Sequence, residues 1–163
     1  MNDQPQKRPG LSNPAVLLAT WFGAGYLPKA PGTWGSLAAL PFAWLIHGQF
    51  GWPGLALATV GVFFIGIWCS TVYIGLSGAD DPGPVVIDEV AGQWLVLIAV
   101  TPDPLLYALG FVFFRIADIT KPWPASWADK TVKGGFGVML DDILAAIYAG
   151  LLLFGVSYWM KMP

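Results

Sequence analysis

The chain has 163 residues, of which 56% are hydrophobic and only 11% are charged. Soluble proteins carry about 25% charged residues, so this composition excludes an ordinary soluble domain. Ten acidic and eight basic residues give a formal net charge of −2, without the basic excess of a nucleic-acid-binding protein, and no nucleic-acid partner is expected. The mean hydropathy of +0.62 excludes a disordered chain.

The few charged residues are unevenly distributed. Residues 30–79 contain no Asp, Glu, Lys or Arg. A helix needs about 20 apolar residues to cross the hydrocarbon core of a bilayer, so this stretch predicts a membrane protein. Cys69, the single cysteine, lies in an apolar run and is expected to be buried, which excludes a disulfide within the chain and a cysteine-based zinc site.

In chain order, residues 1–12 are expected to form a flexible tail. Residues 15–32 are apolar but broken by Gly and Pro, which predicts a short helix at the membrane interface or partly inserted in it. Residues 53–76 form the cleanest predicted span. The shorter segment 36–50, which contains Pro41 and His47, is expected to pair with that span through a turn at residues 51–53. His47 lies far from the acidic residues and is expected to be structural.

Two further apolar segments, residues 90–101 and 104–114, are separated by Pro102-Asp103-Pro104 and predict an antiparallel helical hairpin. Residues 143–160 form the last predicted span. Backbone hydrogen bonds inside a membrane must be closed within each segment, so helices are favoured over strands throughout. The fold class predicted is all-α: a single membrane-embedded domain over residues 1–163 with about four to five membrane-embedded helices, some of them short.

The basic residues predict the orientation. With the N-terminus inside, the inner segments carry all the basic residues except Lys161, namely Lys7, Arg8, Lys29, Arg115, Lys121, Lys130 and Lys133. Cytoplasmic segments of membrane proteins are enriched in Lys and Arg, so this side is expected to face the cytoplasm. Most of the acidic residues fall on the same side: Asp80, Asp81, Asp88, Glu89, Asp118, Asp129, Asp141 and Asp142. We therefore expect a functional site on the cytoplasmic face.

Three acidic groups lie at the ends of predicted helices. Carboxylates near hydrocarbon are costly unless they pair with cations or bind a metal ion. Oxygen ligands suit Mg²⁺, which is often bound by one or two carboxylates together with a substrate phosphate. The three groups are Asp88-Glu89, Asp118 and Asp141-Asp142. Asp118 lies three residues after Arg115, on the same helical face.

Each feature taken alone also has a structural interpretation. The structural interpretation of Arg115 and Asp118 is an ordinary ion pair at a helix end. The structural interpretation of Asp141 and Asp142 is that they cap the last helix and complement its dipole. The Gly-rich segment 133–137 is expected to be a turn before the last helix that exposes N–H groups to an anion, although it lacks the ending of a nucleotide-binding loop. Asp80, close to Pro82, is expected to be solvated. The occurrence of all three acidic groups on one side favours a site.

Four segments carry a resemblance to a known family. They are PGTWGSLAALP at residues 31–41, DPGPVVIDEVAGQW at 81–94, FRIADITKPWPASWADK at 114–130 and GGFGVMLDDILAAIYAG at 134–150. In order and spacing they resemble the phosphatidylglycerophosphatase A family of bacterial inner-membrane lipid phosphatases. The resemblance covers about residues 13–155.

The resemblance implies an activity and a set of site residues. The family removes the terminal phosphate of phosphatidylglycerophosphate to leave phosphatidylglycerol, and it requires Mg²⁺. The implied catalytic residues are Asp88, Glu89, Arg115, Asp118, Asp141 and Asp142, of which all except Arg115 are candidate metal ligands. The expected substrate-binding residues are Lys121, Asp129, Lys130, Lys133, Asp81 and Thr33. The sequence does not indicate an oligomeric state.

Metal-assisted attack by water is the expected mechanism, with Arg115 and Lys121 neutralising charge on the phosphoryl group and Glu89 as base. An aspartyl-phosphate intermediate remains an alternative. Two other classes remain as alternatives. One is a lipid-headgroup phosphotransferase, although this chain lacks the paired Asp-rich turns of such enzymes, and the other is a cation transporter that uses the interfacial carboxylates. The segments 53–76 and 143–160 carry no row of polar residues that would line an ion path across the membrane, which disfavours a transporter.

Overall fold

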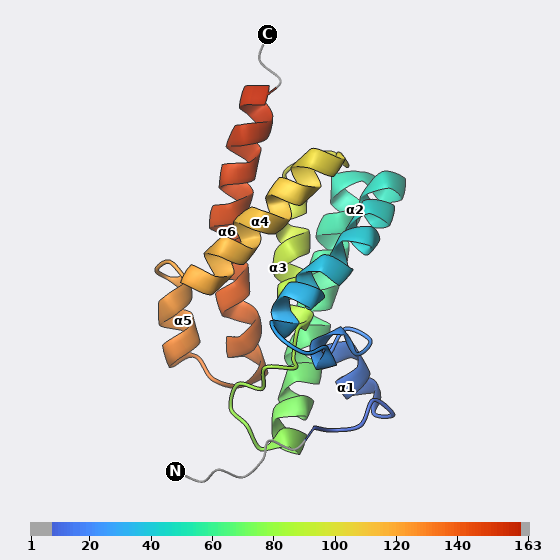
Figure 1. The fold of residues 1–163 in the computed structure, drawn as a ribbon, viewed down its shortest axis with the longest axis vertical. Helices are drawn as coiled ribbons and strands as arrows, with labels where there is room; N and C mark the ends of the chain where they lie inside the picture. Colours follow the sequence, from blue (N-terminus) through green and yellow to red (C-terminus); the bar gives the residue numbers. More distant parts are fainter. Residues whose placement is uncertain (1–7, 161–163) are drawn as a thin grey trace.

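A computed structural model describes residues 8–160, so Lys7 and Lys161 lie outside the described part. Within it the chain forms helices and no strand, as predicted (Figure 1). The elements are α1 (Pro14–Ala19), a 3-10 turn η1 (Ala24–Tyr26), α2 (Pro31–Ser77), α3 (Ile87–Leu97), α4 (Pro104–Thr120), α5 (Ala125–Thr131) and α6 (Gly134–Met160).

Helix α2 is two helical arms joined at Gly51, and the first arm runs up one side of the molecule before the second returns (Figure 1). Gly51 has φ 66° and ψ −171°, a conformation that is essentially restricted to glycine. The predicted pairing of residues 36–50 with 53–76 is therefore confirmed. The first arm begins earlier than predicted, at Pro31, because proline is favoured in the first turn of a helix.

The predicted helices at residues 90–101 and 104–114 correspond to α3 and α4; α3 begins and ends earlier than predicted, and α4 continues to Thr120. Asp103 caps α4, because its side chain accepts a hydrogen bond of 2.9 Å from the backbone N–H of Leu106. α3 is the most enclosed helix of the fold and packs against both α2 and α6, while α4 crosses α6 obliquely (Figure 1). The indole N–H of Trp94 donates to the carbonyl of Ala39 at 2.9 Å, which joins α3 to the first arm of α2.

The start of α6 differs from the prediction. Residues 134–137 are the first turn of the helix and not a separate loop, so Asp141 and Asp142 lie about two turns inside α6. The glycines serve close packing: a Cβ on Gly135 would collide with the carbonyl of Ile67 and the side chain of Thr71. The glycine-rich segment, a pattern typical of a turn, here forms the part of α6 that packs against α2.

The segment 15–32 forms α1 and η1, with Val16 and Ala19 fully buried. Pro9 is buried, and its carbonyl accepts a hydrogen bond from the Tyr26 hydroxyl. The chain is thus fixed to the fold within the segment that was expected to form a tail. Helix α5 was not predicted; residues 125–131 form a short helix directly after Pro124.

Two of the described helices, α2 and α6, are long and apolar enough to cross a membrane. Their large apolar side chains are turned outward: Leu57 is 75% exposed, Phe64 64%, Leu151 67% and Trp159 75%. A water-soluble protein rarely exposes contiguous apolar surface of this kind, whereas a surface in contact with lipid requires it. Both observations support membrane association.

Candidate active site

A cavity of about 210 Å³ lies where the start of α2, the start of α3, the end of α4 and the beginning of α6 meet. Eight of its lining residues are acidic and two are basic. The acidic residues are Asp80, Asp81, Asp88, Glu89, Asp118, Asp129, Asp141 and Asp142, and the basic ones are Lys121 and Lys133. The fold therefore brings together the acidic groups that the sequence placed at separate helix ends.

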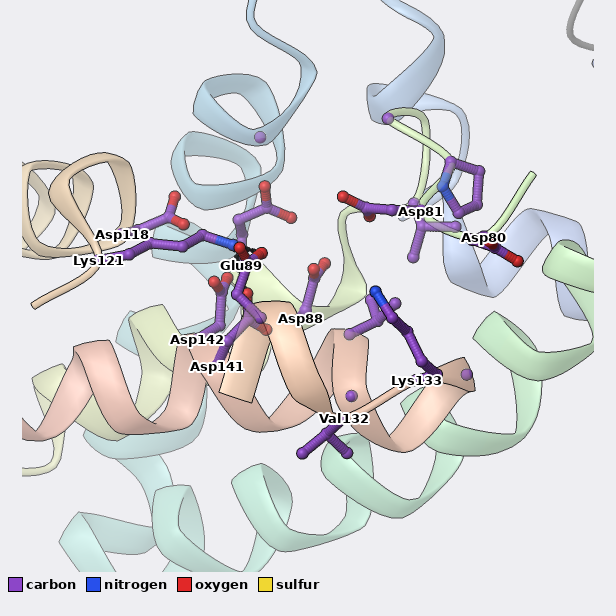
Figure 2. A pocket seen from close by; sticks show the side chains of 18 of the residues that line it. Asp80, Asp81, Asp88, Glu89, Asp118, Lys121, Val132, Lys133, Asp141 and Asp142 are labelled. Atoms are coloured by element: carbon purple, nitrogen blue, oxygen red, sulfur yellow. Dashed lines mark hydrogen bonds and ion pairs between the residues drawn. The ribbon is translucent and has the colours of Figure 1, made fainter. Parts of the chain in front are cut away.

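The centre of the cavity is formed by Asp88, Glu89 and Asp142 (Figure 2). Each offers a carboxylate oxygen within 4.8 Å of those of the other two. Asp88 and Glu89 lie in the first turn of α3, where the helix dipole favours negative charge, and Asp142 approaches from α6. The contact between α3 and α6 is close here because Gly92 lies against Phe114 and the backbone carbonyl of Asp142.

These carboxylates fit a divalent metal ion. Asp88 Oδ1, Glu89 Oε2, Asp141 Oδ1 and Asp142 Oδ2 are buried and accept no hydrogen bond within the described residues. Burial of a charged oxygen without a partner costs several kcal/mol, so a cation that binds these atoms would remove a large penalty. An all-oxygen donor set is the one that Mg²⁺ prefers.

Burial and the close approach of the carboxylates raise the pKa values of Asp88 and Glu89. Burial, followed by the charges of Glu89 and Asp142, raises the pKa of Asp88 well above its usual range. Burial also raises the pKa of Glu89, to about 6, although its hydrogen bond with Asp88 and the charge of Arg115 act in the opposite direction. Without a cation, the cluster therefore holds protons that free carboxylates would release.

Arg115 lies beside this cluster. Its Nη1 is 2.5 Å from Asp118 Oδ2 and 3.7 Å from Glu89 Oε1, and it donates to the Ser36 hydroxyl at 3.4 Å. The predicted pairing of Arg115 with Asp118 on one helical face is confirmed. Because Arg115 also contacts Glu89, the pair of Arg115 and Asp118 belongs to the acidic cluster and is not an isolated ion pair at a helix end. The Nε–H of Arg115 is buried and has no partner among the described residues, so the guanidinium retains a free donor.

Lys121 is engaged by two carboxylates. Its ammonium lies 2.6 Å from Asp129 Oδ1 and also contacts Asp141 Oδ2 (Figure 2). Burial by itself would lower the pKa of Lys121, but the contacts with Asp129 and Asp141 outweigh that effect and raise it. Lys121 ends α4 in the left-handed conformation (φ 42°), which turns the chain toward α5. It therefore links α4, α5 and α6.

The remaining predicted residues lie at the mouth of the cavity or outside it. Asp80 and Asp81 are exposed on the loop before α3, and exposed Lys133 faces the same opening without an ion pair to a described residue (Figure 2). Thr33 is partly exposed and Lys130 is exposed, and neither lines the cavity. His47 is buried and lines a separate cavity with Trp52 and Ser157.

Sequence reasoning missed two residues at this site. Gly32 lines the cavity, and a Cβ there would collide with the carboxyl group of Glu89 and approach Arg115. Ser36 is fully buried one turn later and contacts Arg115. Both belong to the segment PGTWGS, in which two glycines and a proline at a helix start were the available signal.

Comparison with known proteins agrees with this geometry. The family model described as phosphatidylglycerophosphatase A matches residues 17–157. A phosphatidylglycerophosphatase A of Escherichia coli is 42% identical over 159 residues, which cover 96% of this chain and 92% of the relative. One from Haemophilus influenzae is 38% identical, with 97% of this chain and 98% of the relative covered.

A Bacteroides thetaiotaomicron protein, provisionally named a phosphatidylinositol-3-phosphatase, is 38% identical over 89% of this chain and 94% of its own. No solved structure matches the chain. The family model spans most of the sequence, and the relatives align with nearly all of it. The chain belongs to the phosphatidylglycerophosphatase A family.

Proposed function

We propose that this protein hydrolyses the terminal phosphate monoester of phosphatidylglycerophosphate to give phosphatidylglycerol and inorganic phosphate. The observation that carries the proposal is the convergence of Asp88, Glu89 and Asp142 within 4.8 Å, next to an arginine with a free donor. Metal-dependent phosphoryl transfer needs this combination of oxygen ligands and a guanidinium. The names of the Escherichia coli and Haemophilus influenzae relatives supply the substrate.

Mg²⁺ is the proposed cofactor, held by Asp88, Glu89 and Asp142. Asp118 and Asp141 are each bound to a basic residue through one oxygen, and they complete the acidic surroundings. A cavity with eight acidic residues against two basic ones would repel a phosphate dianion, so a divalent cation explains how an anionic substrate enters. When bound, Mg²⁺ polarises the phosphoryl oxygens and favours attack at phosphorus.

The chain's own residues supply the other steps. Arg115 does not line the cavity but contacts Glu89 and Asp118, which do, and from there its guanidinium would neutralise charge on the phosphoryl oxygens. Glu89 accepts a proton from the attacking water, whose oxygen bonds to phosphorus while the bond from phosphorus to the glycerol oxygen breaks. That glycerol oxygen takes up the proton that Glu89 accepted and leaves as a hydroxyl group, so the carboxylate is restored. Lys121 orients Asp141 through their ion pair, and Lys133 attracts the headgroup at the cavity mouth.

The proposed setting is the bacterial inner membrane, with several membrane-embedded helices and the cavity facing the cytoplasm. The two arms of α2, the length of α6 and their exposed apolar side chains support this placement. The shorter helices α3 and α4 would be embedded between them. The basic residues Lys121, Lys130 and Lys133 near the cavity favour the cytoplasmic side.

The test is release of inorganic phosphate from phosphatidylglycerophosphate in detergent micelles, with Mg²⁺ or with EDTA. We expect release with Mg²⁺ and none with EDTA. Asp88→Asn and Asp142→Asn should each reduce kcat by about 100-fold or more. The matched control is Asp103→Asn, because Asn caps a helix as well as Asp does and Asp103 lies outside the cavity. Equal release in EDTA would refute the metal requirement, and no release at all would refute the activity.

Parallel reactions separate the alternatives. Phosphatidylinositol 3-phosphate tests the activity for which the Bacteroides relative is provisionally named. Transfer of phosphate to an added alcohol instead of water would indicate a phosphotransferase. Cation flux in liposomes without hydrolysis would indicate a transporter.

A further inference from the structure

A second concave surface lies between the first arm of α2 and the beginning of α4, with a volume of about 460 Å³. From α2 it is lined by Leu37, Leu40, Pro41 and Trp44, and from α4 by Pro104, Tyr107 and Ala108. None of these residues is charged. The rings of Trp44 and Tyr107 pack edge to face, with centroids 5.0 Å apart, and join the two helices. We call this surface the α2–α4 groove.

The α2–α4 groove lies on the same face of α4 as the part of that helix that lines the acidic cavity. On α4, residues 104, 107, 108, 111, 115 and 118 follow the spacing of a single helical face, so Pro104 and Ala108 share a face with Arg115 and Asp118. On α2, residues 37, 40, 41 and 44 form one face, whereas Gly32, which lines the cavity, lies on another face of that helix. Between the groove and the cavity, Arg115 of α4 donates a hydrogen bond to the Ser36 hydroxyl of α2, so the two helices are in contact there.

The distance between the groove and Arg115 corresponds to half a bilayer. At a helical rise of about 1.5 Å per residue, Ala108 lies about 10 Å and Pro104 about 16 Å along α4 from Arg115. Half of a hydrocarbon core of about 30 Å is about 15 Å, which is the depth that an acyl chain of one leaflet covers. The phosphoglycerol headgroup spans part of this distance, so a lipid with its terminal phosphate near Arg115 would place the first part of an acyl chain at the groove.

We propose that the α2–α4 groove holds an acyl chain of the lipid substrate while the headgroup phosphate occupies the acidic cavity. This inference rests on the proposed function. An acyl chain gains little hydrophobic free energy on leaving bulk lipid for a protein groove, because both surroundings are apolar. The groove therefore orients the substrate, and its effect appears as correct placement of the phosphate for reaction.

Ala108→Trp tests this role, because Ala108 is exposed in the groove and the larger side chain would fill the space. We expect kcat/KM for dipalmitoyl phosphatidylglycerophosphate to fall about ten-fold or more. For the deacylated headgroup, glycerophosphoglycerophosphate, which has no acyl chain to place in the groove, kcat/KM should stay within about two-fold of the wild-type value. Val60→Trp is the control, because Val60 is exposed on the second arm of α2 and lies outside the groove.

A second measurement does not depend on turnover. Phosphatidylglycerol with a photoreactive diazirine close to the carboxyl end of one acyl chain should label residues 37–44 and 104–108 in the wild type, and Ala108→Trp should reduce that labelling. An equal loss of activity on both substrates, labelling spread evenly over the exposed apolar surface, or cross-linking of the groove to a second copy of the chain would each overturn the inference. Failure of the wild type to release phosphate would refute the proposed function, while the labelling pattern would still decide whether the groove binds acyl chains.

Discussion

Replacement of Asp88 by Asn should make the metal-free protein more stable while removing its proposed activity. Asp88 is half-buried, with its Oδ1 fully enclosed, beside Glu89 and Asp142, and each of the three offers an oxygen within 4.8 Å of the others. At an effective dielectric constant of about 20, two unit charges at that separation repel by about 3 kcal/mol. Asn has nearly the same volume as Asp but no charge, so the substitution removes this repulsion without leaving a void.

The net gain is smaller than two full repulsions, because the raised pKa of Asp88 allows it to bind a proton instead. We expect about 1–2 kcal/mol, which for a chain of this length raises Tm by about 2–8 °C. Thermal unfolding in detergent, followed by Trp fluorescence in EDTA, measures the difference. Added Mg²⁺ should raise Tm of the wild type, because a ligand that binds the folded state stabilises it, and should raise Tm of Asp88→Asn much less.

The control is again Asp103→Asn, which removes an acidic residue outside the cavity and preserves the helix cap. Its Tm should match the wild type in EDTA and should rise equally with Mg²⁺. A lower Tm of Asp88→Asn in EDTA would show that the carboxylate stabilises the apoprotein. An equal response of both proteins to Mg²⁺ would show that Asp88 is not a metal ligand. Either result would refute the reasoning.

Three further predictions follow from contacts in the cavity. First, Glu89 has a pKa of about 6 in the folded protein, against an ordinary value of 4.5. Between these pH values the folded state binds more protons than the unfolded state, so Tm of the wild type in EDTA should fall as the pH is raised from about 4.5 through 6. Second, Lys121→Met should lower kcat by about 10–100-fold, because it frees Asp129 and Asp141; phosphate release measures this. Third, Gly32→Ala should abolish phosphate release, because the added Cβ collides with the carboxyl group of Glu89.

Each of these has its own control. The fall in Tm with pH should be smaller in Asp88→Asn, and a wild-type Tm that rises with pH would contradict the assigned direction. Lys29→Met changes an exposed lysine outside the cavity and should keep full activity; an equal loss would make the effect of Lys121 nonspecific. Gly48→Ala lies in the same arm of α2 with no atom near its Cβ, so it should be active and slightly more stable, by about 0.5–1 kcal/mol. Full activity of Gly32→Ala would exclude the proposed collision.

Much of the fold could be predicted because its signals are local. The uncharged segment 30–79 indicated membrane helices, and the helix-breaking residues near 51 and 102–104 marked the reversals that the structure contains. The start of α6 was misplaced for an equally local reason. Glycine is typical of turns in a sequence, and only the packing of Gly135 against the backbone of α2 shows that this position belongs to a helix.

The acidic residues and Arg115 could be identified from their motifs, since carboxylates near an apolar segment are costly and rarely accidental. Their individual contacts could not. The link from Lys121 to both Asp129 and Asp141 joins residues that are 8 and 20 positions apart, and the approach of Gly32 to Glu89 joins α2 to α3. Contacts of this kind depend on how the helices cross.

By itself, the sequence determined that the chain is helical, apolar and membrane-associated, and which few charged residues it retains, because hydropathy and helical periodicity are properties of single segments. The tertiary structure decided that Asp88, Glu89 and Asp142 meet within 4.8 Å, while Lys130 and Thr33 lie outside the cavity. Small residues such as Gly32 and Gly92 allow helix ends to approach closely enough for the carboxylates to converge. Most of the few acidic residues of the chain are thereby brought together in one cavity.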